Sequence, residues 1–306
     1  MELSFVIPLY KMPEYPAIIK KRLTPIAEQI SADYEIILVD DGSADGTWHE
    51  IKKISEQSDK IRGIKLCRNF GQQLAVSSGI SQAKGRYVIV MDGDMQNPPE
   101  ASIDIVARLR EGIDIVYTVS RVRNNWLDQM TSRFFWFTLT KLFGVHMIEN
   151  QLMMRGMSRR FVDIFNSYPE ATRSIAGICK DIGMTHAVIE VENKRREIGK
   201  SAYSLFKRLD LMMNIVISIT TAPLHYLIYV SLFTFIGTIF ALIYYTASLL
   251  LNNVPAGFTS VILSIFFFGS LTTLILGVIG LYLANIYIEV RRRPLFLIEE
   301  QTQNDT

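Results

Sequence analysis

The stretch VIVMDGDMQNPPE, residues 88–100, joins a hydrophobic run to two aspartates, a glutamine and a Pro-Pro turn. The run Tyr87–Val90 is rich in β-branched residues, which is typical of a buried strand. Asp92 and Asp94 then follow the end of that strand, where open α/β sheets bind their ligands, and their spacing points both side chains the same way. The stretch therefore predicts a site for one divalent cation. The alternative is a solvated turn, because Asp, Gly, Asn and Pro all favour turns.

Strands and helices are expected to alternate along the first 120 residues. The patterns predict strands at Leu3–Leu9, Glu35–Val39, Ile61–Cys67, Arg86–Met91 and Asp114–Val119, and helices at Glu14–Ile30, Asp45–Gln57, Gln72–Gln82 and Glu100–Glu111. Such alternation implies right-handed crossovers and a mostly parallel sheet, so the fold class is α/β.

A second acidic stretch, LVDDGSADGT at residues 38–47, follows the second predicted strand. Asp40 is expected to be a ligand-binding residue there, and Asp45 to be the N-cap of the next helix. The chain has no G-x-G-x-x-G and no G-x-x-x-x-G-K-[ST] motif, so it lacks the usual phosphate-binding loops. We therefore expect the acids to hold a metal ion, and the metal ion to hold a diphosphate.

Residues 211–288 contain no Asp, Glu, Lys or Arg. Two uncharged runs, 227–250 and 258–286, are each long enough to cross a bilayer as a helix, which takes about 20 residues. The basic residues Arg291–Arg293 follow them, which places both ends of this hairpin on the cytoplasmic side. The segment 202–220 has the apolar spacing of a helix lying in the membrane interface. For the two uncharged runs the alternative is a buried helical hairpin of a soluble protein. For the segment 202–220 the alternative is a core helix of the soluble domain.

The net charge of +2, with no basic patch among aromatic residues, argues against nucleic acid as a partner.

Five motifs occur here in the order found in one enzyme family: FVIPLY, EIILVDDGSADGT, NFGQQLAVSSG, VIVMDGDMQNPPE and RREIGKSAYS. With these motifs the chain resembles family 2 glycosyltransferases of the GT-A fold, and within them the polyprenyl-phosphate glycosyltransferases. The resemblance implies a cytoplasmic GT-A domain at 1–200, an amphipathic juxtamembrane helix at 201–222, a two-helix transmembrane hairpin at 223–288 and a cytoplasmic tail at 289–306.

On the donor side, the resemblance implies a base-binding pocket formed by Pro8, Tyr10 and Asp40. Asp92 would contact the ribose and the donor sugar. Mg²⁺ or Mn²⁺ would be held by Asp94 and Gln96.

Farther along the chain, the resemblance implies that Arg196 and Ser201 hold the diphosphate or the lipid phosphate; the alternative for Arg196 is a juxtamembrane anchor for anionic lipid. Glu149, or else its neighbour Asn150, would act with Asp92 and Asp94 in catalysis by orienting the acceptor or a sugar hydroxyl. Candidates for binding the acceptor phosphate are Arg121, Arg133 and Lys200, and a solvated basic loop is the alternative for the two arginines.

The implied reaction moves a sugar from a nucleotide-sugar, by default a UDP-sugar, to a polyprenyl phosphate such as undecaprenyl phosphate, with inversion, for modification of cell-envelope glycans. The resemblance also implies a homo-oligomer, a tetramer, in the plasma membrane. The alternatives are a processive polysaccharide synthase, whose Gln-x-x-Arg-Trp motif is missing here, and an inactive membrane scaffold, against which the intact acidic motif argues.

Overall fold

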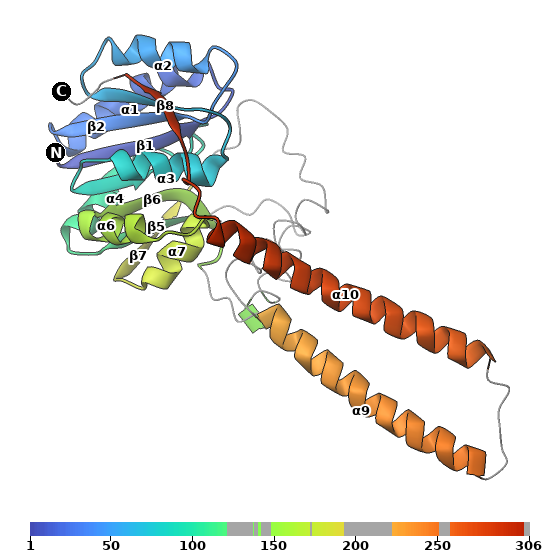
Figure 1. Cartoon of the computed structure of the whole chain (residues 1–306). Coiled ribbons are helices and arrows are strands. Elements are labelled where there is room, and N and C mark those ends of the chain that lie inside the picture. The colour runs from blue at the N-terminus through green and yellow to red at the C-terminus, as the bar shows by residue number, and fades with distance from the viewer. Residues whose placement is uncertain are drawn as a thin grey trace. The chain divides into compact units, whose positions relative to one another are not determined.

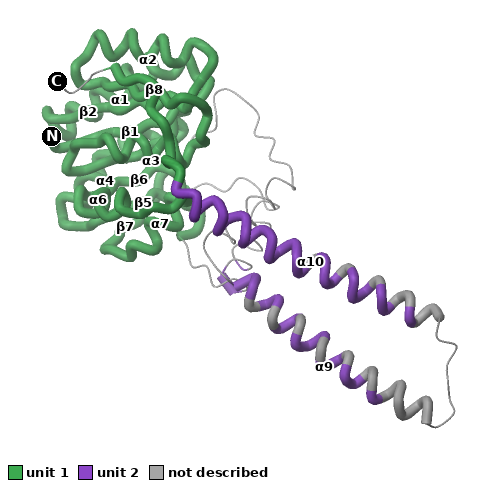
Figure 2. Tube along the Cα trace, in the orientation of Figure 1, with its two compact units in different colours: residues 1–136, 147–203, 293–306 green, residues 137–146, 204–292 purple. Residues whose placement is uncertain are grey.

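The chain divides into two units, which are described here separately (Figure 2). One unit comprises residues 1–136, 147–203 and 293–306, and the other comprises residues 137–146 and 204–292. The structure, a computed structural model, describes residues 1–120, 137, 140–141, 148–171, 173–192, 222–250 and 258–302.

The first unit begins with the predicted alternation of strands and helices (Figure 1). Each strand and helix expected in the first 120 residues forms, and its ends lie within two residues of the predicted ones. The elements are β1 (Leu3–Leu9), α1 (Tyr15–Ile30), β2 (Tyr34–Asp40), α2 (Thr47–Ser55), β3 (Ile61–Leu66), α3 (Gln72–Gln82), β4 (Tyr87–Val90), α4 (Ala101–Arg110) and β5 (Ile115–Ser120). Further elements follow that the sequence patterns did not predict: β6 (Gln151–Ser158), α6 (Arg159–Ser167), α7 (Ile175–Ile182), β7 (His186–Val191) and β8 (Ile298–Gln301).

The described strands form one mixed sheet in the order β7-β5-β6-β4-β1-β2-β3-β8. Its centre, β4-β1-β2-β3, is parallel as predicted. The sheet is mostly parallel, as predicted, and β5 also pairs with β7 in parallel; the exceptions are β6, antiparallel to both β4 and β5, and β8, antiparallel to β3. The carboxyl ends of β1, β2 and β4 still meet at one edge of the sheet.

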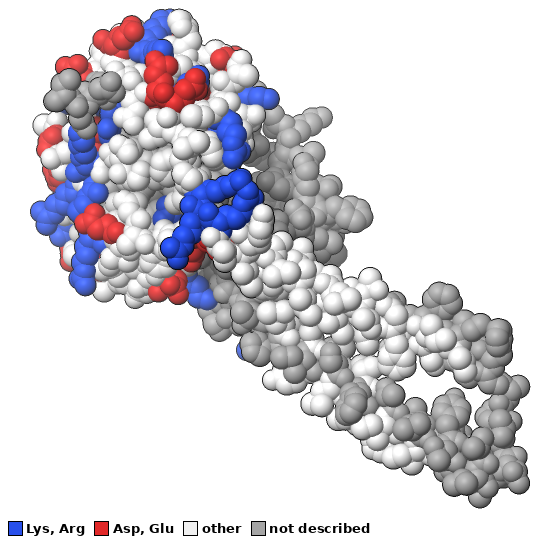
Figure 3. Space-filling view, in the orientation of Figure 1, with Lys and Arg blue, Asp and Glu red and all other residues white. Residues whose placement is uncertain are grey.

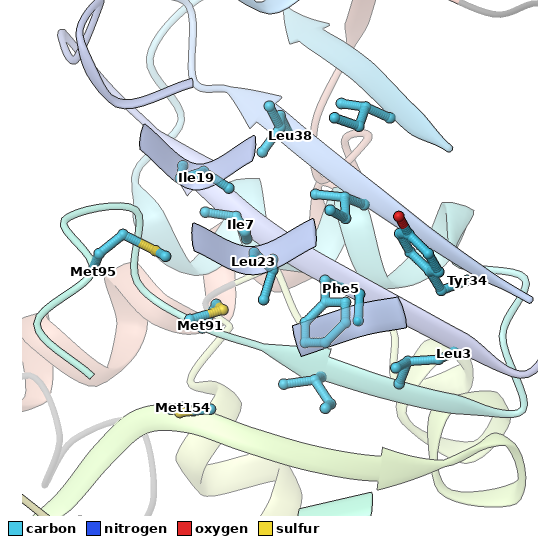
Figure 4. Packing of buried hydrophobic residues seen from close by; sticks show 14 of the residues in the cluster. Leu3, Phe5, Ile7, Ile19, Leu23, Tyr34, Leu38, Met91, Met95 and Met154 are labelled. Carbon is cyan, nitrogen blue, oxygen red and sulfur yellow. The ribbon is translucent and has the colours of Figure 1, made fainter. Parts of the chain in front are cut away.

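Both faces of the sheet are covered by helices, so the central strands are buried on both sides. Alternate residues of β1 enter opposite clusters: Phe5 packs with side chains of α1, α2 and α4, and Val6 packs with side chains of α3, α6 and α7. Figure 4 shows the first cluster, with Ile19 and Leu23 of α1 lying over Phe5 and Ile7.

The C-terminal tail returns to this unit as the edge strand β8, which lies among the N-terminal elements in Figure 1. Trp48 Nε1 donates to Glu300 Oε2 at 2.8 Å, and Lys65 Nζ lies 2.9 Å from Glu299 Oε2. The backbone N–H of Gly63 donates to Thr302 Oγ1 at 2.8 Å. The residues after the second long helix are therefore part of the sheet.

In the described residues, the second unit consists mainly of two long helices, α9 (Ala222–Leu250) and α10 (Phe258–Val290). Within the described part of the chain, one segment, Phe267–Val290, meets the length and hydropathy expected of a membrane-crossing helix, with a mean hydropathy of 1.9. In Figure 3 most of the described surface of α9 and α10 carries no charge, whereas charged side chains are scattered over the first unit. The predicted interfacial helix at 202–220 lies outside the described residues.

Candidate active site

A pocket of about 640 Å³ opens at the carboxyl ends of β1, β2 and β4. Residues from four separate segments line it: Pro8, Leu9, Tyr10, Met12 and Tyr15, from the end of β1 to the start of α1; Asp41 after β2; Asn69, Gly71 and Gln72 before and at the start of α3; and Asp92, Gly93, Asp94 and Gln96 after β4. The predicted residues Pro8, Tyr10, Asp92, Asp94 and Gln96 therefore share one pocket.

The two aspartates after β4 are held differently. Asp92 Oδ1 accepts a hydrogen bond from Gln72 Nε2 at 2.8 Å, and Asp92 Oδ2 accepts one from Asn97 Nδ2 at 3.3 Å. Asp94 Oδ1 accepts one from the backbone N–H of Gln96 at 3.2 Å, within its own loop. Asp92 is thus fixed by side chains from two segments.

Met95, between the two metal-binding candidates Asp94 and Gln96, has left-handed backbone with φ of 54°. Such a conformation costs a non-glycine residue about 1–2 kcal/mol. The Met95 side chain is 4% exposed and belongs to the core cluster around β1, as Figure 4 shows. Burial of the methionine offsets the strain, while the residues on either side of it line the pocket.

Asp40 and Asp41 lie at the end of β2. Asp41 lines the pocket, and Asp40 is not among the lining residues. Asp40 is fully buried; its Oδ1 accepts from the backbone N–H of Ser43 at 3.1 Å, and its Oδ2 has no hydrogen-bond partner among the described residues. Asp41 Oδ1 accepts from the Phe70 N–H at 2.7 Å and its Oδ2 from the Gly71 N–H at 2.9 Å. Burial raises the pKa of both carboxyl groups above the usual range.

The loop after β1 is joined to the loop after β2 by side-chain hydroxyl groups. Ser43 Oγ accepts from the Lys11 N–H and Thr47 Oγ1 from the Met12 N–H, both at 2.9 Å. Asp45 Oδ1 accepts from the Thr47 N–H at 3.0 Å, so it stabilises the start of α2, although the N-cap residue is Gly46. These bonds fix the wall of the pocket that carries Tyr10.

One further predicted residue, Glu149, can be located in the structure. Glu149 is exposed in the turn before β6 and is not among the residues that line the pocket; its neighbour Asn150 has a left-handed backbone, with φ of 55°. The positions of Arg121, Arg133, Arg196, Lys200 and Ser201 lie outside the described residues. In the described ranges no three His, Cys, Asp or Glu side chains gather to hold a metal ion.

The sequence predicted no role for several pocket residues, among them Asn69, Gly71 and Gln72. These three lie in the quoted motif NFGQQLAVSSG, and Gly71 has φ of 93°, a conformation that favours glycine. The signal that could have found them is a glycine directly between a strand and a helix, at the same sheet edge as the acids.

Residues 4–181 match the family model described as Glycosyl transferase family 2. The chain belongs to this family. This glycosyltransferase is 32% identical in sequence to an undecaprenyl-phosphate 4-deoxy-4-formamido-L-arabinose transferase of Aeromonas hydrophila, over 99% of this chain and 94% of the relative. It is 33% identical to the glycosyltransferase YkoT of Bacillus subtilis, over 99% of this chain and 93% of that relative.

The fold of this glycosyltransferase is similar to that of glucosyl-3-phosphoglycerate synthase from Mycobacterium tuberculosis, solved in complex with Mn²⁺, UDP and phosphoglyceric acid. The TM-score is 0.50 at 17% identity, over 71% of this chain and 76% of the other. The likeness shows that the first unit has a GT-A-like α/β fold.

Proposed function

We propose that this glycosyltransferase moves a sugar from a nucleotide-sugar, by default a UDP-sugar, to a polyprenyl phosphate, by default undecaprenyl phosphate. The observation that carries the proposal is the similarity to the Aeromonas hydrophila transferase, which extends over 99% of this chain and includes both long helices. A similarity confined to the sheet would support only the use of a nucleotide-sugar donor and would say nothing of the lipid acceptor.

We place the reaction at the cytoplasmic face of the membrane. In this proposal α9 and α10 cross the membrane as a hairpin, and the segment 201–222 lies in the interface. The hydropathy of Phe267–Val290 supports the second crossing, and the uncharged length of α9, 29 residues, supports the first. Arg291–Arg293 would keep the tail in the cytoplasm.

The donor would bind in the pocket at the sheet edge. We assign recognition of the base to Asp41, with Pro8 and Tyr10, instead of to Asp40, because Asp41 lines the pocket and Asp40 does not. Asp94 and Gln96 would supply oxygen ligands to Mg²⁺ or Mn²⁺, and these cations also bind phosphate oxygens and water. The bound cation would neutralise charge on the departing diphosphate.

The reaction would be a single displacement. An oxygen of the lipid phosphate attacks the anomeric carbon while the bond from that carbon to the diphosphate breaks, and the electron pair leaves with the nucleoside diphosphate. A phosphate monoester is largely dianionic near neutral pH, so the attacking oxygen needs little deprotonation. We therefore assign Glu149 to orienting the acceptor, and Arg196 and Ser201 to holding phosphate groups.

The test uses the full chain in detergent with undecaprenyl phosphate, Mn²⁺ and a panel of UDP- and GDP-sugars, followed by mass spectrometry of the lipid extract. We expect one sugar to appear on the lipid phosphate, and chelation of the metal to stop its transfer. Asp104→Asn, at an exposed position on α4, is the matched control for changes at the pocket. Release of free sugar into water with no glycosylated lipid would contradict the proposed acceptor.

A further inference from the structure

Gln72, the first residue of α3, joins two sides of the pocket. Its Nε2 donates to Asp92 Oδ1 at 2.8 Å, although α3 follows β3 and Asp92 follows β4, and β1 and β2 lie between those strands in the sheet. Both residues line the pocket. The amide therefore connects the segment at the start of α3 with the acidic loop.

The backbone on both sides of Gln72 is fixed. Asp41 accepts the N–H groups of Phe70 and Gly71, at 2.7 and 2.9 Å, immediately before it. Gln73, immediately after it, accepts the N–H of Ile175 through Oε1 at 3.1 Å. The start of α3 is thus held from two directions, and the Gln72 amide is in place before any substrate binds.

A second amide completes the arrangement around Asp92. Asn97 is 2% exposed, and its Nδ2 lies 3.3 Å from Asp92 Oδ2. Each carboxylate oxygen of Asp92 accepts from an amide, and the two hydrogen bonds together set the plane of the group. Asp92 also lines the pocket, so the orientation of its carboxylate matters to a ligand bound there.

We infer that Gln72 is a positioning residue of the donor site. It fixes the orientation of the Asp92 carboxylate, which lines the pocket where the donor would bind. This role rests on the proposed function, because it requires a nucleotide-sugar in the pocket.

The decisive variant is Gln72→Met, which keeps the length of the side chain and removes its N–H donor. The variant loses the hydrogen bond to the Asp92 carboxylate. We therefore expect two constants to rise about tenfold: the Kd of Mn²⁺-UDP, measured by calorimetry, and the KM of the sugar donor. The KM of the polyprenyl phosphate should stay unchanged. Gln72→His keeps an N–H donor at this position, so it should stay within about threefold of the natural protein.

A double-mutant cycle tests whether Gln72 acts on donor binding through Asp92. In an Asp92→Ala background, Gln72→Met should change the Kd of Mn²⁺-UDP by less than about twofold, because the group it positions is gone. The matched control is Gln57→Met, at an exposed glutamine that accepts from Lys20 Nζ at 2.9 Å outside the pocket; it should bind like the natural protein. Gln72 is also exposed, so we expect its variants to fold.

Two outcomes would overturn the inference in distinguishable ways. If the natural protein binds Mn²⁺-UDP and Gln72→Met binds it equally well, Gln72 has no positioning role, and the proposed function stands. If the natural protein binds no Mn²⁺-UDP, the proposed donor is wrong, and the inference is wrong with it.

Discussion

The adjacent aspartates at the end of β2 give the sharpest test of the pocket geometry. In Asp41→Asn, one oxygen remains for two N–H donors, those of Phe70 and Gly71, and the new amide nitrogen must face the other donor. Losing one hydrogen bond to a charged group costs about 1.5–3 kcal/mol. Burial raises the pKa of Asp41 as well, so removing its charge offsets part of that cost, and we expect a net loss of about 1 kcal/mol. For a domain of this size that loss lowers the Tm by about 2–4 °C.

Asp40→Asn is the matched comparison and should behave in the opposite way. The Asp40 Oδ1 acceptor is kept, and the charge at the buried Oδ2, which has no partner among the described residues, is removed. Burial raises the pKa of Asp40 in the folded protein, so the ionised carboxylate destabilises the fold above that pKa and costs nothing below the pKa of the unfolded chain. Asp40→Asn should therefore raise the Tm near neutral pH, and the gain should shrink as the pH falls through the raised pKa.

The assay for both variants is thermal unfolding of the full chain in detergent, at about pH 7.5 and about pH 4.5, with calorimetric titration of Mn²⁺-UDP at the higher pH. Asp41→Asn should weaken binding about tenfold through loss of a hydrogen bond to a charged group, and Asp40→Asn should leave binding unchanged. If Asp40→Asn abolishes binding while Asp41→Asn binds normally, the assignment of base recognition to Asp41 is refuted and the sequence-based assignment to Asp40 is restored.

Three further predictions concern the same sheet. Asp94→Asn should reduce sugar transfer to background at ordinary metal concentrations, as measured in the lipid extract, because an amide holds a cation less well; normal turnover would exclude Asp94 as a metal ligand. Gly42→Ala should destabilise the fold by more than about 2 kcal/mol in thermal unfolding, because a Cβ there would lie 2.2 Å from the carbonyl carbon of Arg68, at φ of 66°. Glu35→Gln should cost about 3–5 kcal/mol in urea unfolding, because it leaves Arg62 buried without its charge partner 3.0 Å away; a loss below about 1 kcal/mol would contradict the importance of this pair.

The acidic loop after β4 shows how far the sequence carries into the site. The hydrophobic run Tyr87–Val90 and the spacing of Asp92 and Asp94 were enough to place both acids at a sheet edge, because strand periodicity and turn chemistry are local properties. The left-handed backbone of Met95 had no local signal, since methionine seldom adopts it and does so here because its side chain is buried in the core.

By itself, the sequence determined the early strands and helices, the acids that follow them and the two long uncharged helices, since these depend on the composition and period of short segments. Only the tertiary structure decided that Asp41 and not Asp40 lines the pocket, that Gln72 reaches Asp92, and that the tail returns as β8 beside β3. The physical reason is that these features depend on which face of a strand is buried and on contacts between distant segments. Such contacts leave no period in the sequence, because strand order is set by the packing of the whole sheet.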